Sequence, residues 1–218
     1  EFFTAPGRTE IVGNHTDHNG GKILAASIDM DTIGAAYPNG TDQVRIISEG
    51  YGRAIEVRVP DAEKTDKMKG TLSLTAGMID GALKRGFQVS GFDMYVSTKV
   101  ISSAGVSSSA SFEMLFCSVV DYFFNDSKMD CADYARIGQY AENHFWNKSS
   151  GLMDQMACAV GGPILLDFAE GVHYEKVEFS FKKMGYDLVI VNTGKGHGDL
   201  SEDYSEVPAE MKAVAKEL

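Results

Sequence analysis

The segment ISSAGVSSSASFE, residues 101–113, joins an alternating, strand-like sequence at 92–100 to a strongly apolar, helical one at 108–124. The start of a helix exposes unpaired backbone N–H groups and about half a positive charge, and small residues let an anion approach them closely. A serine hydroxyl there can also bind Mg²⁺. The segment alone leaves two interpretations open: a phosphate-binding turn, or an ordinary helix capped by serine.

Short runs rich in β-branched residues precede this segment and predict strands. They are TEIVG, KILAASI, TIGAAY, VRIIS and AIEVRV, all within the first 60 residues. Apolar residues at helical spacing then predict a helix over 71–86, ended by Gly86. Further helices are predicted at 108–124, 131–145 and 153–161, strands at PILLDF, VHYEKVEF and YDLVIVN, and a last helix from Ser205. This order of strands, clustered helices and strands indicates an α+β single domain.

The composition limits the partners that the chain can have. Its 218 residues carry a net charge of −11, which argues against nucleic acid or an anionic membrane, since both attract basic surfaces. Cys117, Cys131 and Cys158 stand in apolar, helix-like sequence. Such an odd set favours buried thiols in a reducing compartment, so we expect a cytoplasmic protein. No stretch reaches the roughly 18–20 apolar residues that cross a bilayer.

The segment GNHTDHNGG, residues 13–21, crowds polar side chains between glycines. His15 and His18 are three residues apart, but they would share a face only on a helix, which the glycines disfavour. A metal ion would also need further ligands. Short polar groups on a loop suit a hydroxyl-rich ligand better, and the candidates are Asn14, His15 and Asp17.

The segment GLMDQMACAVGG, residues 151–162, places Asp154 at the start of an otherwise apolar helix. An acid in the first turn of a helix commonly does no more than complement the helix dipole. The alternative is a carboxylate that serves as a general base. Glu142 precedes Asp154 by twelve residues, near the end of the preceding helix, so a short connection would bring both carboxylates to one site.

Four ordered segments, spanning residues 5–204, resemble one known family. APGRTEIVGNHTDHNGGKIL is similar to the galactokinase signature, and GVSSSAS is similar to the GLSSSAS loop of the GHMP small-molecule kinases. AENHFWNKSSGLMDQ resembles the family's AENxF and CGIMDQ segment, with the same interval between Glu142 and Asp154. NTGKGHGDLSEDY resembles the segment that ends in a substrate-contacting tyrosine, here Tyr204.

This resemblance implies a GHMP kinase N-terminal domain, with the fold of domain 2 of ribosomal protein S5. Residues 1–218 would form this ATP- and sugar-binding domain, truncated at both ends. The family's C-terminal domain would then be a missing partner of the chain. We expect the isolated fragment to be inactive for that reason.

The resemblance also implies roles for individual residues. Asp154 would take the proton from the anomeric hydroxyl of the sugar, or orient it, and Arg8 would hold Asp154 ionised and offset charge on the transferred phosphoryl group. The sugar would be bound by Asn14, His15, Asp17, Gly151 and Tyr204. The ATP phosphates would be held by Gly105, Val106, Ser107, Ser108, Ser109 and Ala110, and Mg²⁺ by Ser109 and Glu142.

The implied activity is that of a sugar-1-kinase, a galactokinase, with ATP as co-substrate. Two departures from the signature concern the sugar: Asn14 replaces a glutamate and His18 replaces a tyrosine. They leave open a related kinase for another sugar, such as N-acetylgalactosamine. A non-catalytic galactose sensor on the same fold is a further alternative, although sensors tend to have damaged phosphate loops and GVSSSAS is complete.

Overall fold

The computed structural model describes residues 1–65, 67, 70–146, 148–191 and 201–217, without the side chains of 201–205 and 208. The strands are β1 (Phe2–Val12), β2 (Lys22–Pro38), β3 (Gln43–Ser48), β4 (Ile55–Arg58), β5 (Phe92–Thr98), β6 (Pro163–Asp167) and β7 (His173–Lys176). The α-helices are α1 (Thr71–Lys84), α2 (Ser108–Phe124), α3 (Cys131–Phe145), α4 (Met153–Val160) and α5 (Ser201–Glu217). This content confirms the predicted α+β class.

The long strand β2 organises a mixed sheet in the order β4-β3-β5-β2-β6-β7. One edge of β2 pairs antiparallel with β1, from Phe2↔Ala35 to Val12↔Leu24. The other edge pairs with β5 through residues 32–38 and with β6 through residues 22–26. β3 and β5 run parallel, and the other pairings in the described part are antiparallel. β2 therefore connects the two halves of the sheet.

β1 and β2 are longer than the sequence predicts. The prediction starts the first strand at Thr9 and divides residues 22–37 into two strands, whereas the structure has one strand from Phe2 and one continuous strand of 17 residues. Irregular pairing between Pro6 and Arg8 lets β1 continue past a proline and a glycine, which normally interrupt strands.

The predicted strand at YDLVIVN is wrong for residues 186–191, which form no strand in the structure. The sequence has suitable β-branched residues, but Tyr186, Val189 and Val191 are exposed. Strand propensity mainly reflects packing on a sheet surface, and these residues pair with no strand that the structure describes.

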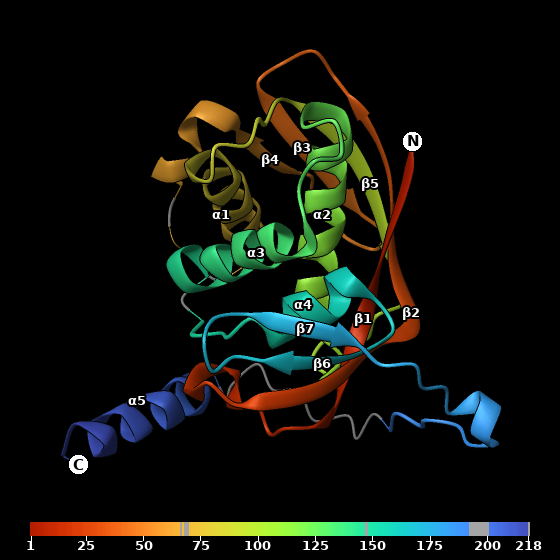
Figure 1. Cartoon of the computed structure of the whole chain (residues 1–218). Coiled ribbons are helices and arrows are strands. Elements are labelled where there is room, and N and C mark those ends of the chain that lie inside the picture. Colours follow the sequence, from red (N-terminus) through yellow and green to blue (C-terminus); the bar gives the residue numbers. More distant parts are fainter. Residues whose placement is uncertain (66, 68–69, 147, 192–200, 218) are drawn as a thin grey trace.

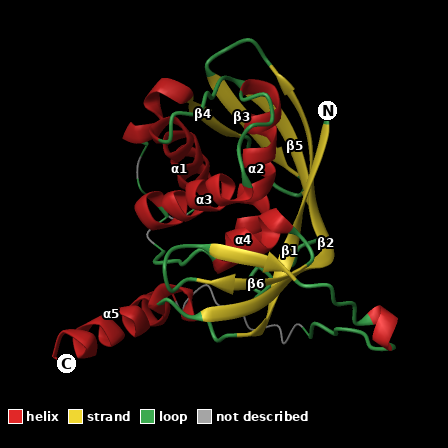
Figure 2. Cartoon of the chain, viewed as in Figure 1, coloured by secondary structure: helices red, strands yellow, loops and turns green. Residues whose placement is uncertain are grey.

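Helices α1 to α4 cover one face of the sheet (Figure 2). In β5, the buried side chains of Phe92, Met94 and Val96 alternate with more exposed ones. α2 packs on β1 and β2, and α1 packs on α3. Both α2 and α3 begin and end where the apolar periodicity predicts, because their buried faces are long and regular.

α4 is held by a small core of its own. Met153, Met156 and Ala157 are buried together with Ile23 of β2 and Ile164 of β6. The helix also packs against β1. This packing places the first turn of α4, which contains Asp154, beside β1.

α5 projects away from the sheet at the C-terminal end of the chain (Figure 1). It begins at Ser201, earlier than the predicted start at Ser205. Among the helices that the structure describes, none combines the length and apolar content that crossing a membrane requires.

Three helices meet in a buried polar contact. Gln155 of α4 donates through Nε2 to Glu113 Oε2 of α2 at 3.0 Å and to Glu142 Oε2 of α3 at 3.2 Å. All three side chains are fully buried. Burial, together with the charge of Glu142, raises the pKa of Glu113 well above its ordinary value. The raised pKa favours the neutral form of Glu113, and in that form only Glu142 can contribute a negative charge to this contact.

The contact between α1 and α3 depends on Gly77. A Cβ atom there would lie 2.8 Å from both Cα and Cβ of Ala141, so the two helices would have to separate. We expect Gly77→Ala to lower the free energy of unfolding by about 1–3 kcal/mol, although alanine favours a helix. A Cβ at Gly52 would meet nothing within 4 Å, so Gly52→Ala should change it by less than about 0.5 kcal/mol. Urea unfolding measures both, and equal stability of the two variants would contradict the close contact.

Buried Glu113 makes stability depend on pH. Because its pKa is raised in the folded state, its contribution to stability is full below the unfolded value of about 4.3 and is lost as pH rises through the folded pKa. Glu113→Gln keeps the shape and cannot lose a proton. We expect the melting temperature of this variant, relative to that of wild type, to increase as pH rises above about 4.3 and to level off above the folded pKa of Glu113. The corresponding free-energy difference grows by at most about 1.4 kcal/mol per pH unit. A difference that does not vary with pH would show that the pKa of Glu113 is ordinary.

Candidate functional site

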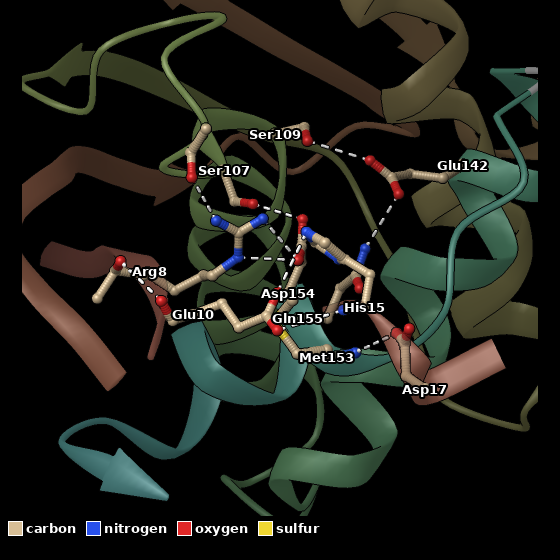
Figure 3. Close-up of polar contacts among 12 residues, drawn as sticks. Arg8, Glu10, His15, Asp17, Ser107, Ser109, Glu142, Met153, Asp154 and Gln155 are labelled. Atoms are coloured by element: carbon tan, nitrogen blue, oxygen red, sulfur yellow. Dashed lines mark hydrogen bonds and ion pairs between the residues drawn. The ribbon is translucent and has the colours of Figure 1, made fainter. Parts of the chain in front are cut away.

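An ion pair joins β1 to α4. Arg8 approaches Asp154 Oδ1 through Nε at 2.8 Å and through Nη2 at 2.7 Å (Figure 3). The side chain of Arg8 is 6% exposed and that of Asp154 is 20% exposed. Burial alone would raise the pKa of Asp154, but the charges of Arg8 and Lys148 outweigh it and lower the pKa below its ordinary value. Asp154 is therefore an ionised carboxylate in a partly open position.

The same ion pair holds the turn that precedes α2. Arg8 Nη1 donates to the carbonyl oxygen of Gly105 at 2.5 Å, and its backbone N–H donates to the carbonyl oxygen of Val106 at 3.1 Å. Ser107 Oγ donates to Asp154 Oδ2 at 2.5 Å. The predicted acid, the predicted arginine and the serine-rich turn are thus brought together in one place.

The turn has an unusual backbone. Ser103, Gly105 and Ser107 have positive φ angles of 58°, 72° and 54°, which serine seldom adopts. Ser107 is the N-cap residue of α2 but makes no side-chain cap bond, and its hydroxyl contacts Asp154 instead. The ordinary serine cap, one of the two interpretations of the sequence, is therefore not formed. Val106 and Ala110 are buried, whereas Ser108 is partly exposed at the first position of α2.

Ser109 lies opposite Glu142 of α3. Ser109 Oγ donates to Glu142 Oε1 at 3.1 Å, and Lys148 Nζ contacts the same oxygen at 2.7 Å. Burial acts to lower the pKa of Lys148, but the charges of Glu142 and Asp154 outweigh it, so the pKa is raised. The sequence analysis did not single out Lys148. The one sequence signal for it is its position between Glu142 and Asp154, in the segment that connects α3 to α4.

Asp17 and Gly151 are in close contact. The side chain of Asp17 is 6% exposed and accepts a hydrogen bond from the backbone N–H of Met153 at 3.1 Å. A Cβ atom at Gly151 would lie 1.8 Å from Asp17 Oδ2, so Asp17 can keep this position only beside a glycine. Residues Thr16–Asn19 form a short 3-10 helix, contrary to expectation. The glycines flank these four residues, so they limit the helix to about one turn and do not prevent it.

The other predicted sugar contacts are less enclosed. Asn14 and His15 are exposed and have left-handed backbone, with φ angles of 54° and 52°. The backbone N–H of His15 donates to Glu10 at 3.2 Å. Tyr204 falls on α5, but its side chain lies outside the described residues, as does the preceding segment 192–200. Within the described part, no group of three or more His, Cys, Asp or Glu side chains is arranged to hold a metal ion.

Two regions of the chain match known families. Residues 1–38 match the galactokinase galactose-binding signature, and residues 73–162 match the N-terminal domain of the GHMP kinases. The first region contains Arg8 and Asp17. The second contains the turn before α2 and Asp154, so the ion pair connects the two matched regions.

Curated galactokinases are similar over nearly the whole chain. The galactokinase of Lactococcus lactis subsp. lactis is 33% identical over 226 residues, which cover 100% of this chain and 55% of that protein. The galactokinase of Clostridium tetani is 29% identical, over 98% of this chain and 54% of that protein. The chain therefore spans about half the length of the curated relatives that it matches.

Solved structures share the fold. The crystal structure of Lactococcus lactis galactokinase complexed with galactose matches with a TM-score of 0.82 and 27% identity, over 100% of this chain and 57% of that one. The Methanococcus jannaschii mevalonate kinase matches with a TM-score of 0.69 and 16% identity, which shows likeness of fold alone. Fold, matched regions and relatives agree: this chain contains a GHMP kinase N-terminal domain together with the galactose-binding signature of the galactokinases.

Proposed function

We propose that residues 1–218 form the ATP- and sugar-binding domain of a galactokinase. The full-length protein transfers the γ-phosphoryl group of ATP to the anomeric hydroxyl of galactose. The observation that carries this proposal is the ion pair of Arg8 with Asp154, because it fixes an ionised carboxylate beside the turn at the start of α2. A donor phosphate at the turn and an acceptor hydroxyl at the carboxylate would be neighbours, as phosphoryl transfer requires.

Asp154 acts on the acceptor. Its lowered pKa keeps it ionised at neutral pH, so it accepts a hydrogen bond from the anomeric hydroxyl. It takes the proton as the bond from that oxygen to the γ-phosphorus forms and the bond from the γ-phosphorus to ADP breaks. Because the transition state of phosphoryl transfer is loose, orienting the hydroxyl is the larger part of this role. Arg8 holds the carboxylate in place.

The sugar lies against the segment 13–21. Asp17 is fixed by the N–H of Met153, and its remaining lone pairs accept hydrogen bonds from sugar hydroxyls. Support for galactose comes from the similar Lactococcus lactis galactokinase, which is complexed with galactose. The full set of proposed sugar contacts is Asn14, His15, Asp17, Gly151 and Tyr204.

The nucleotide phosphates bind along residues 105–110, where the dipole of α2 and its first N–H groups favour an anion. The neighbouring oxygens suit Mg²⁺, because Ser109 Oγ and Glu142 Oε1 lie 3.1 Å apart. In the structure, Lys148 Nζ contacts the same carboxylate oxygen. Ser109 and Glu142 would hold the ion. When bound, Mg²⁺ supplies positive charge to the phosphates of ATP.

The proposal includes a cytoplasmic location. Cys117, Cys131 and Cys158 are all free thiols, and two of them are buried. Burial raises the pKa of Cys117 and Cys158 well above the ordinary value, which keeps these thiols protonated and unreactive. Free, buried thiols are typical of a reducing compartment.

Asp154→Ala tests the role of the carboxylate. We expect it to lower the turnover of D-galactose by the full-length protein about 10²-fold or more, because the hydroxyl loses its acceptor and Arg8 loses its partner. Asp126→Ala removes an exposed carboxylate paired with Lys128 and should change turnover less than about twofold. Release of ADP measures both.

The same assay, run with a panel of hexoses, separates the alternatives. Absence of ADP release with every hexose, or an Asp154→Ala variant as fast as wild type, would refute the proposal. Binding of both ATP and galactose without turnover would indicate a sensor. Faster turnover of N-acetylgalactosamine than of galactose would assign the kinase to that sugar.

Gly151→Ala tests the sugar side alone. The added Cβ would displace Asp17 from its present position, since the two would be 1.8 Å apart. We expect the KM for galactose to rise about tenfold or more, equivalent to about 1.4 kcal/mol, while the KM for ATP changes less than about twofold. Gly52→Ala is again the control. An unchanged KM for galactose would place the sugar away from Asp17.

A further inference from the structure

The described part of the site contains two cationic side chains, Arg8 and Lys148, and all three guanidinium nitrogens of Arg8 already make contacts. Its Nε and Nη2 both contact Asp154, and its Nη1 donates to the carbonyl oxygen of Gly105. Its side chain is only 6% exposed. A phosphoryl group that bound Arg8 would have to share the guanidinium with the acid and the turn that it positions.

Lys148 is placed differently. Its Nζ contacts Glu142 Oε1 at 2.7 Å, and the same oxygen accepts from Ser109 at 3.1 Å. The ammonium is therefore no farther from Ser109 Oγ than the sum of these two distances. Ser109 is the second residue of α2, so Lys148 reaches the first turn of the helix that follows the serine-rich turn.

Lys148 is partly exposed, so a ligand can reach its ammonium. Its side chain is 40% exposed, while that of Glu142 is 1% exposed. The backbone N–H of Lys148 donates to the carbonyl oxygen of Glu142 at 3.1 Å, which anchors the base of the side chain. A lysine ammonium is a compact charge on a flexible stem, and it can leave one oxygen of a carboxylate for a phosphate oxygen nearby.

We propose that Lys148 is a nucleotide-binding residue, and that its ammonium contacts the terminal phosphoryl group of a bound nucleoside triphosphate. The inference rests on the proposed function, which supplies the triphosphate at residues 105–110. In this inference Lys148 balances the negative charge on the transferred phosphoryl group, whereas the resemblance implies that Arg8 does so. Arg8 keeps the role of holding Asp154.

The test compares a triphosphate analogue with a diphosphate. Binding of the non-hydrolysable analogue AMP-PNP and of ADP to the full-length protein is measured by calorimetry in the presence of Mg²⁺. We expect Lys148→Met to raise the Kd for AMP-PNP about tenfold, and the Kd for ADP less than about twofold, because ADP has no terminal phosphoryl group at that position. Lys148→Arg keeps the charge and should recover most of the lost affinity.

Lys128→Met is the matched control, since Lys128 also forms an ion pair, with Asp126, and is exposed. It should alter neither Kd. Equal AMP-PNP affinity for wild type and Lys148→Met would overturn the inference and leave the proposed kinase intact. Equal losses for AMP-PNP and ADP would also overturn it, because Lys148 would then act only by supporting Glu142. Wild-type protein that binds no AMP-PNP would overturn both the inference and the proposed function.

Discussion

The ion pair between Arg8 and Asp154 is the contact on which the site depends. It joins a strand near the start of the chain to a helix 146 positions later. Removing one partner of such a poorly solvated pair leaves an uncompensated charge, which costs more than the intact pair contributes. Gly105 and Ser107 bond to the same two side chains. β1, α4 and the turn before α2 therefore behave as one unit, and the start of α2 cannot shift without breaking a charged contact.

The carboxylates near this pair differ in how their charge is balanced. Glu113 is fully buried, and burial together with the charge of Glu142 raises its pKa, so it can remain neutral at little cost. Glu142 is equally buried, but the ammonium of Lys148 balances its charge. Asp154 is balanced by Arg8. The proposed donor and acceptor sides thus each have a carboxylate with its own cation, whereas the raised pKa of the third acid, Glu113, favours its neutral form.

The sequence predicted those features that local pattern determines. The bounds of α2 and α3 and the start of α4 follow from apolar periodicity, and the motifs identified Arg8, Ser107 and Asp154 as members of one site. Features that depend on partners distant in sequence were missed. The full length of β1 and β2 requires their mutual pairing, and residues 186–191 lack a partner strand in the described part. The sequence did not indicate Lys148, because its place beside the site follows from its contact with Glu142, which no single motif predicts.

The difference between the two cations fits the different tasks that we propose for the two sides of the site. An acid that orients a hydroxyl has to stay in one place, so a buried, planar guanidinium with several fixed contacts suits Arg8. A phosphoryl group in transfer moves from one oxygen to another, and the flexible stem of a lysine lets its ammonium stay in contact with that group. The side chain of Lys148 is 40% exposed; its ammonium contacts one carboxylate oxygen and lies 5.8 Å from the ring centroid of Trp146, so it is held by fewer fixed bonds than the guanidinium of Arg8. Exchanging the two residue types would therefore impair both sides, although the net charge of the site would be unchanged.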